Sequence, residues 1–320
     1  MGIRNLLLRL FEEDYETSGD YSYISQLAII TIKSLMPMEN EEGVRIDQER
    51  FTEELKLWKY YKIGSNKALM NAIDGLGDGD YWTTGDDSIV SRIVPLLAAN
   101  TRKEIAEEEL IKSILFTSGK VEDLLGSILI LNLIHSLNFN YGIEDLIAIL
   151  KDRVIRLSQT SYLEKYLDEY RTGDFPQNFQ IEFEREKINV LNILNGKESD
   201  KYADLQDCLG VLEQKQPNTL MGRVLYSHLY KGEVYCRLPK FYLSLEEYVF
   251  KLRKSRIEPE KLKMDKYILP DIFSFKEGEV FYHSLLNQAK LIRRLRDGPM
   301  ETAVVQTRSG IYVFKKGIHE

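Results

Sequence analysis

One segment of the chain limits the fold more than any other. Residues 120–137 read KVEDLLGSILILNLIHSL, and apolar side chains cover nearly every face of the helix that they would form. Other elements have to surround such a helix, because none of its faces suits water. Its uninterrupted apolar part, 124–134, is shorter than the roughly 18–20 residues that cross a membrane. The segment therefore predicts the central helix of a multi-helix core.

The other segments supply the surrounding helices. Apolar residues recur at three- and four-residue steps, which is the spacing of one helix face. Helices are predicted over 22–36, 50–61, 65–70, 88–100 (interrupted or entered at Pro95), 102–115, 143–156, 160–170, 182–195, 200–213, 219–231, 244–255 and 277–298 (ended by Gly298). Only 302–316 differs, since β-branched and aromatic residues flank Arg308-Ser309-Gly310 and predict a hairpin. The predicted fold class is all-α, a compact helical bundle with a small C-terminal β-hairpin.

Composition narrows the functional classes. The 50 acidic and 43 basic residues give a net charge of −7, which argues against non-specific binding to nucleic acid. Cys208 and Cys236 form no CxxC pair, so a disulfide framework and a cysteine-rich zinc site are excluded. The chain has no membrane-spanning run and no signal-peptide pattern. We therefore expect a cytoplasmic location and no membrane partner.

The loop at 75–95, GLGDGDYWTTGDDSIVSRIVP, gathers aspartates among glycines before an apolar helix. It lacks the Glu at the twelfth position of a calcium loop, the GK[ST] of a P-loop and the strand that precedes a dinucleotide fingerprint. One interpretation is an exposed connection in which Asp87 or Ser88 caps the next helix. The other is an acidic site rebuilt from Asp78, Asp80, Asp86 and Asp87.

Five segments follow one another in an order that carries a family resemblance. They are 22–35, 51–69, 86–97 (with Arg92 and Pro95), 115–134 and 216–239. In the same order, ADP-ribosylglycohydrolases have a Thr-Asp-Asp-Thr helix, a tryptophan helix, a Gly-Asn-Gly loop, a Thr-His helix and an Asp-Thr-Asp-Thr helix. The chain resembles that family over residues 18–240. The resemblance implies a compact orthogonal bundle for residues 1–240, with 241–320 packed on the same domain.

The departures from the family pattern concern its metal centre. In the family, the aspartates of the first and last motifs hold two Mg²⁺ ions that orient the ribose of the substrate. Here the first motif reads Ser22-Tyr23-Ile24-Ser25 and the last reads Gln216-Pro217-Asn218-Thr219, while the Thr-His motif reads Thr117-Ser118. Neutral hydroxyl and amide oxygens are poor ligands for two hard cations. We therefore expect no metal site and no cofactor.

The resemblance and its departures together predict a non-catalytic relative. It would bind ADP-ribose, an ADP-ribosylated protein or another protein partner through Ser22, Ser25, Asp87, Ser88, Gln216, Asn218 and Thr219. The alternative is a divergent hydrolase of N- or O-glycosidic ADP-ribosyl bonds, with Asp86 and Asp87 as its catalytic carboxylates. Mg²⁺ is expected only in that alternative. A third hypothesis is a structural helical protein unrelated to this chemistry.

Overall fold

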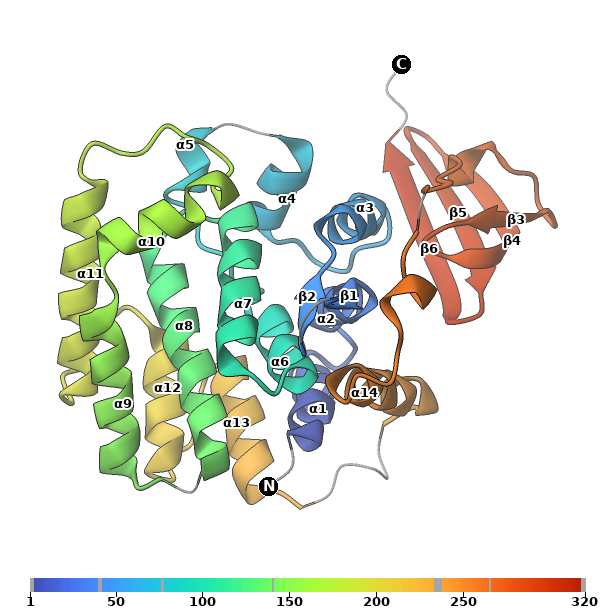
Figure 1. Cartoon of the computed structure of the whole chain (residues 1–320). Helices are drawn as coiled ribbons and strands as arrows, with labels where there is room; N and C mark the ends of the chain where they lie inside the picture. Colours follow the sequence, from blue (N-terminus) through green and yellow to red (C-terminus); the bar gives the residue numbers. More distant parts are fainter. Residues whose placement is uncertain are drawn as a thin grey trace.

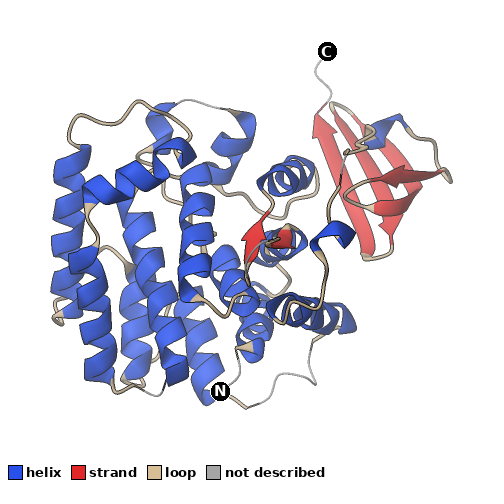
Figure 2. Ribbon diagram, in the orientation of Figure 1, coloured by secondary structure: helices blue, strands red, loops and turns tan. Residues whose placement is uncertain are grey.

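The computed structural model describes residues 3–39, 42–75, 78–139, 141–232, 238–264 and 266–317. The side chain of Asp78 lies outside this description, as does Cys236, so the expectations on both stay open. Figures 1 and 2 show a body of packed helices with a small sheet at one side. None of the helices in the described ranges has the length and apolar character needed to cross a bilayer.

The helical body contains most of the chain. Its α-helices are α1 (Arg4–Ser18), α2 (Tyr23–Lys33), α3 (Gln48–Trp58), α4 (Lys67–Asp74), α5 (Asp78–Tyr81), α6 (Val90–Ala99), α7 (Lys103–Thr117), α8 (Val121–Ser136), α9 (Ile143–Arg156), α10 (Gln159–Tyr166), α11 (Phe179–Leu194), α12 (Ala203–Leu212), α13 (Leu220–Tyr230) and α14 (Lys240–Arg253). A short two-stranded ribbon, β1 (Leu35–Pro37) and β2 (Val44–Ile46), separates α2 from α3.

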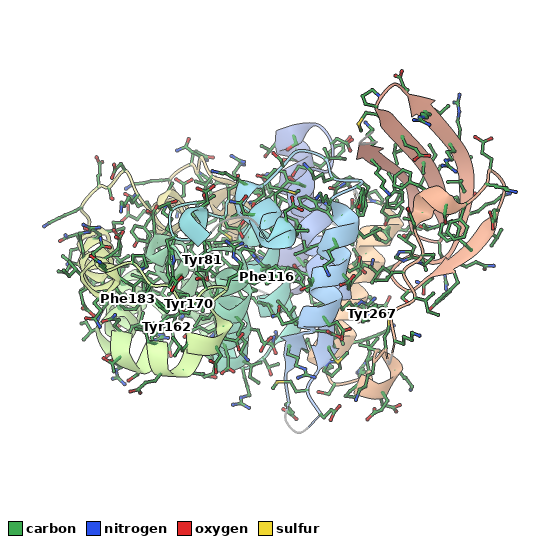
Figure 3. The ribbon with its side chains drawn as sticks, turned by 90° about the horizontal axis from the view of Figure 1, so that it is seen from above. Tyr81, Phe116, Tyr162, Tyr170, Phe183 and Tyr267 are labelled. Atoms are coloured by element: carbon green, nitrogen blue, oxygen red, sulfur yellow. The ribbon has the colours of Figure 1, made fainter. Side chains whose placement is uncertain are left out.

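The prediction of a central helix is confirmed. All but three of the sixteen residues of α8 are buried, and α7, α9, α11 and α12 pack around it. Helix α6 is buried along its whole length and continues through Pro95, so the chain neither breaks nor begins a helix there. One flank of the body is rich in aromatic rings, with Tyr81, Tyr162, Tyr170 and Phe183 close together in Figure 3.

Helix α1 was not expected from the sequence. Its apolar residues Leu6, Leu7 and Phe11 are fully buried, and it packs against α13 and α6. The acidic residues Glu13 and Asp14 in its second half are buried as well. Buried polar groups need hydrogen-bond partners, and only the tertiary fold supplies these.

The prediction of a helix over 277–298 is wrong. The segment forms two antiparallel strands, β3 (Val280–His283) and β4 (Asn287–Asp297), which continue into β5 (Met300–Thr307) and β6 (Gly310–Gly317). Asn287 has a left-handed φ of 58°, which no helix tolerates in its interior. Gly298 also has a positive φ, but it lies in the β4–β5 turn rather than at a helix end. The predicted hairpin at 302–316 is confirmed as the second half of this sheet, so the fold is helical with a four-stranded C-terminal sheet.

Candidate functional site

A small pocket lies where the N-terminal ends of several helices meet. Its cavity measures about 150 Å³ and is walled by the 86–90 segment and by parts of α6, α8, α12 and α13. We call it the helix-end pocket. Its lining residues are Asp86, Asp87, Ile89, Val90, Ile93, Glu122, Asp123, Gly126, Ser127, Ile130, Tyr202, Ala203, Asp204, Leu205 and Met221. Because helix N-termini carry partial positive charge, the carboxylates of this lining are favourably placed.

Asp86 is a structural carboxylate within this wall. It is 5% exposed, forms a buried ion pair with Arg92, and accepts hydrogen bonds from the backbone N–H of Ser88 (2.9 Å) and Asn66 Nδ2 (2.9 Å). Burial by itself would raise the pKa of Asp86, but the charge of Arg92 and the hydrogen bonds of Ser88 outweigh it and the pKa is lowered. Asp86 is therefore held ionised. Its oxygens are saturated by protein groups, which leaves Asp86 a poor acid or base.

Asp87, by contrast, is exposed. Its carboxylate accepts hydrogen bonds from Tyr23 Oη (3.0 Å) and Asn66 Nδ2 (2.5 Å). Tyr23 belongs to the first turn of α2, so this contact joins the Ser22–Ser25 motif to the pocket rim. The structure thus places Asp87 where a ligand in the pocket would meet a free carboxylate edge.

Ser22 and Ser25 lie near the pocket rim but contact Asp14 instead of the cavity. Both hydroxyls donate to Asp14 on α1, at 2.5 Å each, and the backbone N–H of Ser22 donates to the same carboxylate at 2.9 Å. Asp14 is 2% exposed. The two serines therefore hold a buried carboxylate in place, and neither lines the pocket. Sequence reasoning missed Asp14 because nothing in its local pattern distinguishes it from the neighbouring acids of α1.

The last motif divides between two places. Thr219 caps α13 by accepting from the backbone N–H of Gly222 at 3.1 Å, and its hydroxyl also hydrogen-bonds the pocket residue Asp204. Asn218 and Gln216 are exposed and line a separate cavity of about 360 Å³ beside α12. Gln216 donates there to Tyr226 Oη (2.9 Å). The structure therefore places Thr219 and Ser88 next to the helix-end pocket, where each hydrogen-bonds a lining carboxylate, and Asp86 and Asp87 line the pocket. Gln216 and Asn218 line the other cavity.

Asp80 and Ser88 show how the acidic loop is used. Asp80 is exposed and pairs with Lys67 at 2.9 Å, and it does not line the pocket. Ser88 is buried and donates its hydroxyl to Asp86 at 2.5 Å. The loop therefore contributes one structural pair, Asp86 and Ser88, and one exposed pocket residue, Asp87.

Asp123 is the pocket residue that sequence reasoning missed most clearly. It accepts from the backbone N–H of Asp86 (2.9 Å) and from Ser118 Oγ (2.8 Å). Burial and, to a smaller degree, the charge of Asp86 raise the pKa of Asp123 to about 6, although both hydrogen bonds oppose the rise. The only local signal is the Glu-Asp pair in the first turn of a helix, which is common at helix starts.

Asp204 and Tyr202 form the α12 side of the pocket. Asp204 is exposed as a whole residue, but the pocket walls shield its carboxyl from water and this burial raises its pKa. The charges of Asp207 and Asp87 raise the pKa further. Tyr202 has a left-handed φ of 59° and donates its hydroxyl to Glu186 at 2.9 Å. A Cβ on Gly126 would come within 3.2 Å of the Tyr202 ring, so glycine lets this wall pack closely.

The oxygens of the two divergent motifs do not fit a pair of Mg²⁺ ions. The Ser22 and Ser25 hydroxyls are directed at Asp14, while Gln216 and Asn218 face another cavity. Among the described residues, no group of three or more His, Cys, Asp or Glu side chains is arranged to hold a metal ion. No metal-dependent step is therefore derived for this pocket.

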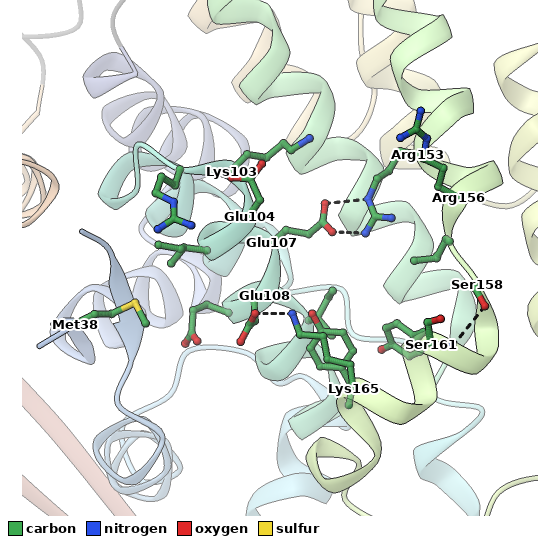
Figure 4. Close-up of a pocket in the computed structure, with 17 residues that line it drawn as sticks. Met38, Lys103, Glu104, Glu107, Glu108, Arg153, Arg156, Ser158, Ser161 and Lys165 are labelled. Atoms are coloured by element: carbon green, nitrogen blue, oxygen red, sulfur yellow. Dashed lines mark hydrogen bonds and ion pairs between the residues drawn. The ribbon is translucent and has the colours of Figure 1, made fainter. Parts of the chain in front are cut away.

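A larger cavity, of about 500 Å³, lies between α7, α9 and α10 (Figure 4). Its charged groups neutralise one another. Arg153 pairs with Glu107, which also accepts from Asn132 Nδ2 at 2.6 Å, and Lys165 pairs with Glu108 at 2.6 Å. These ion pairs link α9 and α10 to α7 and so stabilise the packing of the three helices.

Neither a comparison with models of known protein families nor a search of curated proteins finds a match to this chain.

Proposed function

We propose that this chain is a non-catalytic, ADP-ribosylglycohydrolase-like binding protein, and that the helix-end pocket receives ADP-ribose or an ADP-ribosylated protein. One observation carries the proposal. Three segments chosen for their resemblance to the family, 86–97, 115–134 and 216–239, all contribute walls to this single pocket. A fourth, 22–35, reaches its rim through the hydrogen bond from Tyr23 to Asp87.

The size and charge of the pocket favour the ribose end of such a ligand. A cavity of about 150 Å³ is small beside the roughly 300–1,000 Å³ of typical ligand sites, so it takes one ring and not the whole molecule. Sugar hydroxyls donate hydrogen bonds that carboxylates accept. The exposed carboxylate of Asp87 and the partly desolvated carboxyl of Asp204 line the pocket and suit this role. The diphosphate would stay outside, because the acidic lining repels it.

The test is calorimetric titration of ADP-ribose into the whole chain, with millimolar Mg²⁺ and again with a chelator. We expect the same affinity in both buffers. Asp87→Ala should weaken binding about tenfold, the effect of losing roughly 1.4 kcal/mol of contact. Asp152→Ala is the matched control, since Asp152 is an exposed aspartate on α9 that pairs only locally with Arg156. It should bind as the wild type does.

Two results would contradict the proposal. Absence of binding in both buffers would remove ADP-ribose as the ligand. Binding that requires Mg²⁺ would mean that a metal site forms from carboxylates, and would favour an enzyme.

A specific observation also supports the alternative, a divergent hydrolase of ADP-ribosyl bonds. Asp86 and Asp123 are linked by a hydrogen bond, yet the pKa of one is lowered while that of the other is raised to about 6. Carboxylates whose pKa values are pushed apart are typical of general acid–base pairs. In this version Asp123 is the proton donor, Asp86 is not catalytic because Arg92 holds it ionised, and Asp87 is the exposed base.

The enzyme version is tested by release of ADP-ribose from an ADP-ribosylated protein. Asp123→Asn should abolish the activity, and the activity of the wild type should fall as pH rises through 6, because the acid form of Asp123 is then lost. Undiminished turnover by Asp123→Asn would exclude this role.

A further inference from the structure

The C-terminal sheet has two unlike faces. The inner face carries Phe281, Ala289, Leu291, Ala303, Val305 and Phe314, all 7% exposed or less, and they form one apolar cluster with Leu57 of α3 and with Ile272 and Phe273. The outer face is turned away from the helical body (Figure 1). Strand pairing aligns its residues in three rows: Val280–Lys290–Gln306–Ile311, Arg293–Val304–Val313 and Leu295–Thr302–Lys315.

The outer face is unusually apolar for a face in water. Val280, Tyr282, Leu295, Ile311 and Val313 are between 42% and 64% exposed. An antiparallel sheet with one buried face normally presents polar residues on the other. Contiguous exposed apolar residues with a polar rim mark protein interaction surfaces. The register joins Val304, Ile311 and Val313 into one apolar group on β5 and β6, and Lys290 and Gln306 separate this group from Val280 on β3.

The two faces also carry charge. On the inner side, Arg294 pairs with Glu301 and Lys316 with Asp271, while Arg296 has no ion-pair partner among the described residues. On the outer face, Lys290, Arg293 and Lys315 have no ion-pair partner within the described part of the chain. Lys290 and Arg293 on β4 and Lys315 on β6 therefore share the outer face with this apolar group, in a chain whose net charge is −7.

We propose that the outer sheet face docks an amphipathic helix of a partner protein, with acidic residues along both sides of its apolar stripe. Val304, Ile311 and Val313 would bury the apolar stripe of that helix. Lys290, Arg293 and Lys315 would meet its acidic flanks. Strands β5 and β6 have eight residues each. At about 3.4 Å per strand residue and 1.5 Å per helix residue, they match a helix of roughly 18 residues.

Other occupants fit this surface less well. Single-stranded nucleic acid needs aromatic platforms for its bases, and Tyr282 is the one aromatic side chain among the strongly exposed residues of this face. A bilayer needs side chains that can enter the lipid, whereas Gln288, Gln306 and Thr302 are interspersed across the face. Protein side chains, in contrast, satisfy both the aliphatic and the cationic groups.

The probe is a fluorescent 18-residue peptide with Leu at helical i, i+3, i+4 and i+7 spacing and Glu on both flanks. Its controls are a scrambled peptide of the same composition and a version with Lys in place of Glu. Fluorescence anisotropy with the full chain should show binding of the Glu peptide at least about tenfold tighter than of either control.

Two sets of variants locate the binding. Lys290→Glu, Arg293→Glu and Lys315→Glu together should weaken it about tenfold or more, while Ile311→Thr with Val313→Thr should weaken it through lost apolar contact. The matched control is Lys151→Glu, Lys197→Glu and Lys240→Glu, which changes the net charge equally on the helical body. It should change affinity less than twofold, and circular dichroism checks that every variant is folded.

Three outcomes would overturn the proposal. One is equal binding of all three peptides. Another is loss of peptide binding in the control triple as large as in the sheet triple. The third is that an oligo-dT strand or anionic vesicles, but not the peptide, lose binding when the sheet cations are reversed. None of these outcomes bears on ADP-ribose, so this test and that of the helix-end pocket fail independently.

Discussion

Asp86 and Asp123 share one hydrogen bond, and yet their surroundings move their pKa values in opposite directions. Arg92 pairs with the first carboxylate, whereas no cation of the described residues forms an ion pair with the second, on which the charge of Lys120 has only a small effect. At the scale of single residues, the ion pair with Arg92 decides which of the two carboxylates is held ionised. Two predictions follow from these two residues.

Breaking the buried Asp86–Arg92 pair should be costly. Arg92→Ala leaves Asp86 as an uncompensated buried charge, and we expect a loss of about 3–5 kcal/mol in the free energy of unfolding by urea. Lys67→Ala breaks the exposed Lys67–Asp80 pair and should cost far less, because solvent screens an exposed pair. Equal losses in both variants would mean that the Asp86–Arg92 pair contributes no more than a surface pair.

Asp123 should make stability depend on pH. Its pKa is 3.8 before burial and about 6 in the fold, so the folded state holds more protons between these values. Wild-type stability therefore falls as pH rises from about 4 to 6. The Asp123→Asn variant has no carboxyl at this position, so its stability should not fall with pH in this way. Its free energy of unfolding minus that of the wild type should therefore rise by up to about 3 kcal/mol between pH 4 and pH 7. A difference that is the same at both pH values would show that the Asp123 pKa is not raised.

At the scale of elements, one strand boundary coincides with a backbone conformation outside the regular region. Asn287, the first residue of β4, has a left-handed φ, in a segment whose apolar spacing resembles that of a helix. Asparagine tolerates this conformation better than most residues, and β-branched residues tolerate it poorly.

Substitutions at Asn287 test this explanation. Asn287→Gly should be neutral or slightly stabilising, while Asn287→Val should destabilise the sheet by about 1–2 kcal/mol. Hydrogen exchange of β3 and β4 amides would measure both effects locally, with the amides of α8 as an internal reference. If the valine variant protects the strands as well as the glycine variant does, the turn conformation is not what sets this boundary.

At the scale of the whole molecule, Lys33 belongs to a buried ion pair of the helical body and also hydrogen-bonds the C-terminal sheet region. Glu54 of α3 is fully buried and pairs with Lys33 of α2 at 2.5 Å, and Lys33 also donates to the backbone carbonyl of Leu285 at 3.0 Å. Nearby, the backbone N–H of Lys315 donates to the carbonyl of Tyr60 at 2.7 Å. These contacts hold the sheet against α3.

Lys33→Met should loosen that attachment. It leaves Glu54 buried without a cation, which costs about 3–5 kcal/mol, and it removes the bond to Leu285. We expect faster proteolysis of the connection over 254–279. Adding Glu54→Leu should restore much of the protection, since apolar side chains replace a buried pair well. The control is Lys59→Met, at the C-cap of α3, which breaks an exposed pair with Asp74 of α4. Cleavage that is equally fast in both single variants would exclude a specific role for Lys33.

The sequence alone predicted a helical body, the buried central helix α8 and the hairpin β5–β6, because each follows from side-chain periodicity within one segment. It also marked Asp86 and Asp87, which line one pocket, and Ser88 and Thr219, which hydrogen-bond carboxylates of that pocket. Only the tertiary structure decided that Asp14, Asp123 and Asp204 belong to the same region. Their roles depend on partners far along the chain, and no local pattern records such contacts. For the same reason, 277–298 became strands, since pairing with β5 outweighs the local helical spacing.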